Sequence, residues 1–250
     1  MSGTLLLILL AAAPPAASPL PASERPSYEQ LRGGVDADGQ VTDPRLRQET
    51  GWAVVRGFAW RIELEDTHRP GWFVPVDARD TFHSDQRFRI EVEAFCDVYV
   101  YVVVRNADGS HDVLLPEPEE ETPRMAKGQT VVLPSDGTAF RFQPPGGTHQ
   151  LRLVASPVKL PWADSRRLLD LKNGQELPTQ GESNPATPRS IPQVKGLEAV
   201  IRQIDRGDLA KGCVVELVEP AAEGNLVTLT SADPSAKPIL VHDVALKQVD

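Results

Sequence analysis

The side chains able to do acid–base or metal chemistry are scattered singly along this 250-residue chain. The histidines are His68, His83, His111, His149 and His242. His83, His111 and His149 fall near predicted turns or strand starts, where folding could gather them, but zinc ligands usually cluster in the sequence. The chain has no G-x-S-x-G turn, H-E-x-x-H helix, C-x-x-C pair or phosphate-binding glycine loop. We therefore assign no catalytic, cofactor-binding or metal-ligating residue, and expect the histidines to be exposed polar residues of a sheet.

A run of acidic residues could bind a hard cation such as calcium through carboxylate oxygens. The run consists of Glu117, Glu119, Glu120 and Glu121. Prolines flank it, and its spacing matches no organised ligand loop. We expect a solvated loop there, and we predict neither a metal nor a cofactor for the chain.

The tryptophans are candidates for contact with a sugar or a protein partner, because an indole ring offers a large apolar face and one donor. Most aromatic residues of a soluble chain are nevertheless core residues. Trp72, in RPGWF, and Trp162, in LPWADS, lie beside prolines in predicted loops. We predict these two as exposed binding contacts.

The two cysteines, Cys96 and Cys213, could pair if the protein is exported to an oxidising compartment. The alternative is two small buried thiols. The sequence does not place their Cα atoms within bridging distance, so both alternatives stay open.

The secondary structure that positions these residues is clearest in residues 88–104, FRIEVEAFCDVYVYVVV. Apolar and polar residues alternate over 88–94, which is typical of a strand with one buried and one wet face. Residues 98–104 are apolar on both faces, as in a strand covered on both sides. The stretch therefore predicts two strands joined at Phe95-Cys96-Asp97, of which the second is more deeply buried.

Similar short runs, separated by Gly and Pro turns, recur along the chain. They lie at 52–65, 71–76, 111–116, 130–134, 139–143 and 148–156, and three more follow Cys213. Helices are predicted from Asp164 or Ser165 to the stop at Asn173-Gly174, and over 195–207 from an i, i+3, i+4, i+7 apolar stripe. The pattern predicts a mainly β chain: an antiparallel β-sandwich, Ig-like in general architecture, with one or two short inserted helices.

The expected domain organisation has three parts. Residues 1–22 are a signal peptide, 23–50 a flexible N-terminal arm, and 51–250 a single sandwich with a helical or loop insertion at about 160–211. The last strands are expected to complete the same sandwich, because three isolated strands make a poor domain. A separate small C-terminal domain is the alternative.

Residues Thr81 to Pro157 resemble a bacterial family known as domain of unknown function 4384. The matching stretches are TFHSDQRFRIEVEAFCDVYVYVVVRNADGSHDVLLP, AKGQTVVLP and FRFQPPGGTHQLRLVASP. They contain, in order, the family's strand before an Asp-Gly turn, its "lP" strand, its "PpG" turn and its "aS.p" ending. Ser84-Asp85 stands where the family usually has Gly-Asp, and Glu117 where it often has Asn.

The resemblance implies a sandwich-like module of exported or envelope-facing bacterial proteins. Related domains are fused to varied partners, including peptidase-like and kinase-like domains, which implies an accessory or recognition role. The resemblance carries no catalytic residue over to this chain.

Export is also predicted by the first residues, where an apolar core from Leu5 to Ala13 precedes small residues and prolines. We expect a periplasmic, extracellular or cell-surface protein, with no integral membrane span after signal removal, because no later segment is long and apolar enough. The net charge of -9 and sequence pI of about 5.1 argue against nucleic acid as a partner.

We therefore expect a non-catalytic accessory module that mediates protein–protein interaction at the bacterial cell envelope, with an envelope protein of unknown identity as its partner. The alternative is a carbohydrate or small-ligand binding module, and a third hypothesis is an enzyme with a composite site. Protein binding predicts a large exposed apolar patch. Ligand binding predicts a concave pocket with aromatic residues and converging polar groups, and an enzyme predicts titratable groups placed against one another.

Overall fold

The chain crosses from one sheet to the other within residues 88–104, where the alternation of apolar and polar residues stops. In the computed structural model, β4 (Arg87–Ala94) alternates buried and half-buried residues, whereas β5 (Val98–Arg105) is buried on both faces. Val100 of β5 belongs to the core between the sheets, and Tyr101 belongs to a separate outer cluster. The two predicted strands and their different burial are therefore confirmed.

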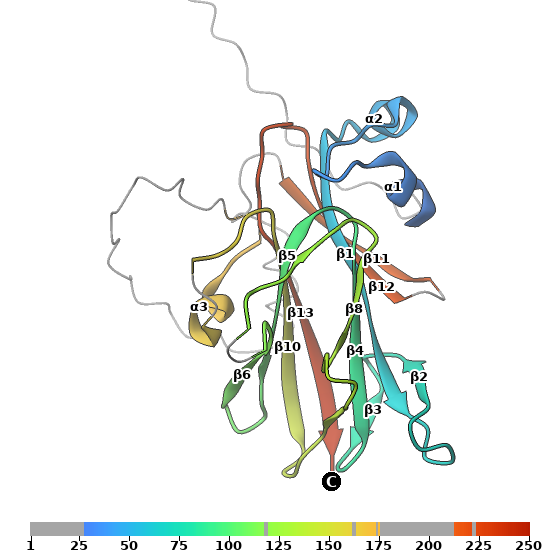
Figure 1. Ribbon diagram of the computed structural model, residues 1–250, viewed down its shortest axis with the longest axis vertical. Helices are drawn as coiled ribbons and strands as arrows, with labels where there is room; N and C mark the ends of the chain where they lie inside the picture. The colour runs from blue at the N-terminus through green and yellow to red at the C-terminus, as the bar shows by residue number, and fades with distance from the viewer. Residues whose placement is uncertain (1–27, 118–119, 162–163, 174, 176–212, 222–223) are drawn as a thin grey trace, which may run out of the picture.

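The structure describes residues 28–117, 120–161, 164–173, 175, 213–221 and 224–250, which form a sandwich of two facing sheets (Figure 1). The strands of the first sheet are, in spatial order, β11 (Cys213–Ala221), β12 (Gly224–Ser231), β1 (Val54–Glu65), β4 and β8 (Thr130–Leu133), with β2 (Phe73–Val76) on β1 and β9 (Phe140–Arg141) on β4. The strands of the second are β3 (Thr81–His83), β13 (Leu240–Val249), β10 (Gly147–Ser156), β5 and β6 (His111–Leu115), with β7 (Arg124–Met125) on β5. All pairs are antiparallel except β3 with β13. The predicted mainly β sandwich is confirmed.

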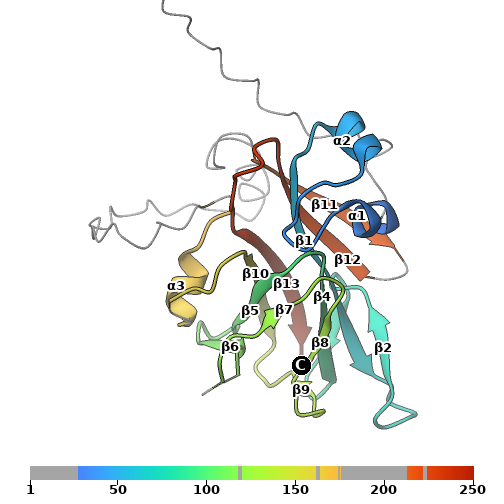
Figure 2. The ribbon, with the colours of Figure 1, turned by 45° about the horizontal axis from the view of Figure 1, so that its top comes forward.

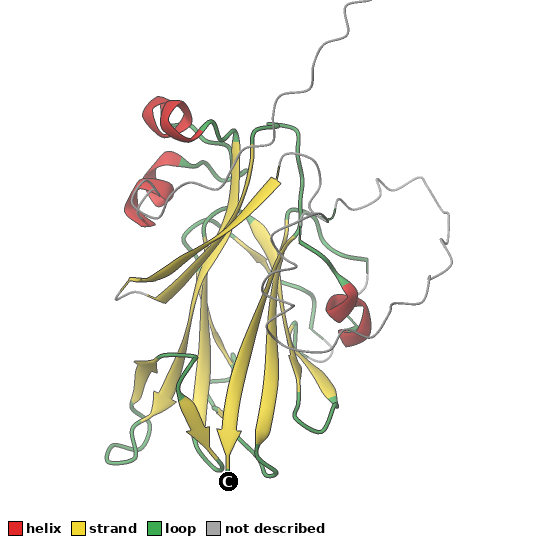
Figure 3. Cartoon of the chain, turned by 180° about the vertical axis from the view of Figure 1, so that it is seen from behind, coloured by secondary structure: helices red, strands yellow, loops and turns green. Residues whose placement is uncertain are grey.

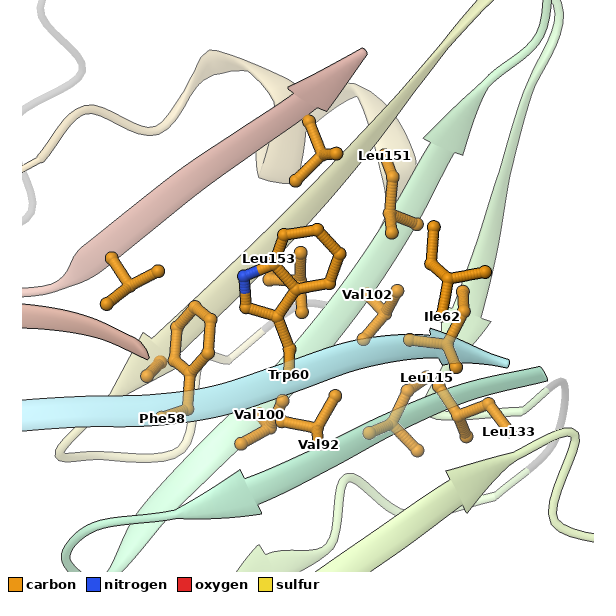
Figure 4. Packing of buried hydrophobic residues seen from close by; sticks show 14 of the residues in the cluster. Phe58, Trp60, Ile62, Val92, Val100, Val102, Leu115, Leu133, Leu151 and Leu153 are labelled. Carbon is orange, nitrogen blue, oxygen red and sulfur yellow. The ribbon is translucent and has the colours of Figure 1, made fainter. Parts of the chain in front are cut away.

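The main core fills the space between the sheets. Phe58, Trp60 and Ile62 of β1 project inward and pack with inward residues of β5 and β10, such as Val102 and Leu153 (Figure 4). Burial of these side chains is the dominant stabilising contribution, at roughly 25 cal/mol for each Å² of apolar surface removed from water.

The N-terminal segment differs from the expected flexible arm over residues 28–50. It forms α1 (Tyr28–Gly34) and α2 (Pro44–Thr50), which lie on the outer face of the first sheet (Figure 2). Leu31 and Leu46 are buried there in one cluster with Trp52. Helices of seven residues are too short to be stable alone, so packing against the sheet must hold them.

The outer face of the second sheet is covered by α3 (Ser165–Asp170), on the flank opposite α1 and α2 (Figure 3). Asp164 caps its N-terminus, as the sequence predicts, by accepting a hydrogen bond from the Arg167 backbone N–H at 3.0 Å. The helix ends earlier than expected, because Leu171 is already extended with φ -64° and ψ 145°.

The C-terminal strands are shared between the sheets. β12 pairs with β1 and β13 pairs with β10, so these strands complete both layers rather than form a separate unit. The expected signal peptide (1–22) and the expected helix at 195–207 lie outside the described residues. Within the described ranges, no helix is long and apolar enough to cross a membrane.

Candidate functional site: a cavity between the sheets

Residues of both sheets line a cavity of about 450 Å³. The lining lies toward the end of the sandwich at which β13 reaches the C-terminus, which is marked C in Figure 1. Its walls come from both layers: Phe88 and Ile90 of β4 on one side, Leu151 of β10 and Leu246 of β13 on the other. The alternation along these strands points all four side chains inward. The floor of the cavity is therefore apolar.

Aromatic rings form one wall. Phe88 stacks on Phe142 with 4.4 Å between ring centroids, and Phe140 lies tilted against Phe88 at 5.5 Å. Phe82 extends the group behind Phe142 at 4.9 Å. Phe88, Phe140 and Phe142 therefore give the cavity an aromatic, apolar side, with Phe82 packed outside the lining.

The polar rim is the turn between β5 and β6, which runs from Asn106 to Gly109. Gly109 has φ +87°, as this turn requires. The amide nitrogen of Asn106 donates to Ser110 Oγ at 3.0 Å and to Asp112 Oδ2 at 3.1 Å. Asp108 Oδ1 accepts hydrogen bonds from the Ser110 hydroxyl at 2.6 Å and backbone N–H at 2.8 Å. These bonds lower the pKa of Asp108, so its carboxylate stays charged.

His149 links the rim to the second sheet. Its Nε2 lies 2.7 Å from Gln248 Oε1, and its Nδ1 lies 3.4 Å from Asn106 Oδ1. The Gln248 amide nitrogen donates to Ser84 Oγ at 2.9 Å and to the Gln143 carbonyl at 3.0 Å, which fixes its oxygen toward His149. Both ring nitrogens therefore face protein oxygens, and a neutral imidazole donates to one of the two.

The other side of the mouth carries the loop from Arg141 to Pro145. The guanidinium of Arg141 lies 3.7 Å from the carboxylate of Asp85. Asp85 has a left-handed φ of +68°, and its backbone N–H donates to the Phe142 carbonyl at 2.8 Å. Ser84 bonds to Gln248 of β13 and Asp85 to the loop of Arg141 and Phe142, so the pair connects both sides of the cavity.

The predicted tryptophan contacts do not meet at this site. Trp72 is 60% exposed in the turn between β1 and β2, but it does not line the cavity. Trp162 lies outside the described residues. The expectation that Trp72 is exposed is confirmed, and its binding role stays a prediction.

The suggested disulfide between Cys96 and Cys213 is not formed in the structure, where Cys96 is a free, fully buried thiol. Cys96 follows β4, whereas Cys213 begins β11, and strands β1 and β12 lie between them. Three steps of about 4.8 Å separate such positions by about 14 Å, twice the reach of a disulfide. Burial raises the pKa of the Cys96 thiol, so it is held neutral.

Three histidines differ from the expected exposed sheet residues. His111 is half-buried, and its Nδ1 lies 3.1 Å from Ser165 Oγ. His149 is half-buried in the cavity lining. His242 of β13 lies between the sheets, with its ring centroid 5.5 Å from that of Trp60, and burial lowers its pKa to about 4. The signal for His242 was present, because alternation from Leu240 to Leu246 places it on the inward face.

Among the residues that the structure describes, no group of three or more His, Cys, Asp or Glu could hold a metal ion. The acidic run has structural roles instead: Glu117 accepts hydrogen bonds from Ser135 N and Oγ at 2.9 and 2.6 Å, and Glu121 pairs with Lys159 at 3.2 Å. Glu119 lies outside the described residues.

The chain was compared with family models, curated proteins and solved structures, and one family model matches part of it. Residues 81–159 match the model of the family described as Domain of unknown function (DUF4384), which confirms the resemblance. No curated protein and no solved structure matches the chain. The match begins at β3 and runs just past β10, and every residue that lines the cavity falls within it except Leu246. The cavity is therefore a feature of the matched segment.

Proposed function

We propose that this protein is a non-catalytic binding module that holds a small ligand in the cavity between its sheets. The observation that carries the proposal is the cavity itself, which holds about 450 Å³ and is lined by apolar side chains of the strands and, to a comparable extent, by polar groups near its mouth. Ligand pockets typically enclose about 300–1,000 Å³, and a few placed polar groups orient the ligand on a largely apolar lining.

The arrangement of the polar groups favours binding over catalysis. A general base must reach the reacting proton with a free nitrogen or oxygen. The ring nitrogens of His149 lie 2.7 Å from Gln248 Oε1 and 3.4 Å from Asn106 Oδ1, so neither points freely into the cavity. These contacts give the rim a fixed geometry suited to recognition.

The surface favours a small ligand over a protein partner. Among the described residues, the large apolar side chains that are exposed are Trp72, Val74 and Val158. Two of them are neighbours in and beside β2, and the third lies in another loop. Protein-binding surfaces usually show a contiguous apolar patch of several hundred Å².

Protein binding at the cell envelope remains a second candidate function because of β2. This strand pairs only with β1, so its other edge is free of strand partners in the described structure, and Trp72 and Val74 stand exposed beside it. An open strand edge with an aromatic neighbour can accept an extended peptide. With export expected from residues 5–13, the partner would be a periplasmic or cell-surface protein.

A fragment screen by ligand-observed NMR tests both candidates. We expect hits on the unmodified protein that disappear in Leu114→Trp, in which a larger side chain fills the cavity, and persist in Trp72→Ala. Thermal melting of each variant checks that it is folded. Hits that persist in Leu114→Trp and vanish in Trp72→Ala would move the site to β2, and a screen with no hit would refute ligand binding.

A further inference from the structure

The mouth of the cavity carries an unbalanced negative charge. Asp108 and Asp112 both belong to the β5–β6 turn that lines it. No Lys or Arg nitrogen of the described residues lies within 4 Å of either carboxylate. The cationic side chain in the lining, Arg141, already faces Asp85 across 3.7 Å. A ligand entering here meets two carboxylates that no described Lys or Arg side chain pairs with; besides its hydrogen bonds to Ser110, Asp108 interacts electrostatically with His149.

The free hydrogen-bonding capacity of the rim is that of an acceptor. Both bonds to Asp108 go to Oδ1, and the bond to Asp112 goes to Oδ2, which leaves the second oxygen of each carboxylate available. The donors of the rim are engaged, because the Asn106 amide donates to Ser110 and Asp112 and the Ser110 hydroxyl donates to Asp108. A matching ligand must therefore supply the donors.

The aromatic wall suits the same kind of ligand. The stacked rings of Phe88 and Phe142, with Phe140 tilted beside them, form the apolar side of the cavity. Ring faces carry negative charge density and attract an ammonium or guanidinium group within about 6 Å. They also bury the apolar body to which such a group is attached.

We propose that the cavity takes an organic cation, an amine or guanidinium carried on a compact apolar or aromatic body. The cationic group donates to Asp112 and Asp108 at the mouth, and the body packs against the phenylalanine wall. This inference rests on the proposed function and names its ligand class. The net charge of -9 adds a weak long-range attraction for cations.

A matched set of probes tests the charge: 3-phenylpropylamine, 3-phenylpropanol and 3-phenylpropionate, which share size and shape. Binding is measured by protein NMR titration at pH 7.5 on the full chain. We expect the amine to bind at least about tenfold more tightly than the alcohol, and the acid to bind more weakly still. Asp112→Asn should lower the amine affinity about three- to tenfold while leaving the alcohol unchanged, because it removes a charge and keeps the side-chain shape.

Asp233→Asn is the matched control. Asp233 accepts hydrogen bonds from the N–H and hydroxyl of Ser235, the same turn that Asp108 makes with Ser110, but it lies outside the cavity lining. An equal loss of amine affinity in Asp233→Asn and Asp112→Asn would overturn the proposal. Equal affinity for amine and alcohol would overturn the cation class and leave ligand binding intact. Fragment hits in the cavity together with no amine binding would also overturn the cation class and leave ligand binding intact.

Discussion

Acidification from pH 7.5 to 4.5 should destabilise the fold through His242. The ring of His242 lies between the sheets, with its centroid 5.5 Å from Trp60 and 6.5 Å from Phe58. Burial disfavours the imidazolium and lowers the pKa to about 4 from the ordinary 6.5, and the neighbouring Asp243 opposes this only in part. The folded protein therefore keeps this histidine neutral where an unfolded chain would protonate it.

The sign and size follow from proton linkage. Between pH 6.5 and 4 the unfolded state binds a proton that the folded state does not, so stability falls as pH falls through this window. With pKa values of about 6.5 unfolded and about 4 folded, the free energy of unfolding should drop by about 2.5 kcal/mol between pH 7.5 and 4.5. That is a large part of the 5–15 kcal/mol typical of a domain.

The assay is urea unfolding at half-unit pH steps on the unmodified protein and on His242→Leu, which has similar volume and does not titrate. The carboxylates, such as Asp108 and Asp136 with their lowered pKa values, contribute equally to both proteins, so the difference between the curves isolates His242. Parallel curves for the two proteins over this range would refute the reasoning. So would an NMR titration that places the His242 pKa near 6.5.

Four further substitutions, one of them a control, test single contacts by urea unfolding. Tyr101→Phe removes the hydroxyl that accepts a hydrogen bond from the buried Leu160 N–H at 2.8 Å, and should lower the free energy of unfolding by about 1–3 kcal/mol. A change within error would show that water takes the place of the hydroxyl. Gly39 and Gly137 have similar left-handed φ values of +80° and +79°, but a Cβ added at Gly39 would lie 2.8 Å from a carbonyl oxygen, whereas one at Gly137 would meet open space. Gly137→Ala should lower the free energy of unfolding by about 1 kcal/mol, and Gly39→Ala by clearly more. Equal losses in the two variants would exclude the clash. Asp43→Ala removes the α2 cap and should cost about 1 kcal/mol, and no loss would mean that α2 does not need it.

The strands were predictable because a strand with one buried face has apolar and polar residues in alternation. Alternation over 88–94 and its loss over 98–104 gave both the strand type and the covered outer face of β5. Asp164 marked the start of α3 by its capping chemistry. The helices α1 and α2 escaped prediction because each is seven residues long, and their stability comes from contacts with Trp52 and the sheet.

The cavity was not predictable for a different reason. Alternation shows that strand residues such as Phe88 and Leu151 face inward, but not that the facing side chains leave space unfilled there. That depends on how two sheets with distant sequences oppose each other. Trp72 and Trp162 were predicted as contacts because they lie in loops, and a loop position does not show whether a residue lines a cavity.

The segment that matches a family is only part of a folding unit. Residues 81–159 contain β4 and β10, yet the neighbour of β4 over seven Cα pairs is β1, and the neighbour of β10 over nine is β13. A fragment cut at the limits of the match would open both of these hydrogen-bonded ladders and expose the inward face of each sheet to solvent. Sequence boundaries drawn from recognisable motifs therefore fall inside this sandwich, whose sheets take strands from β1 through to β13.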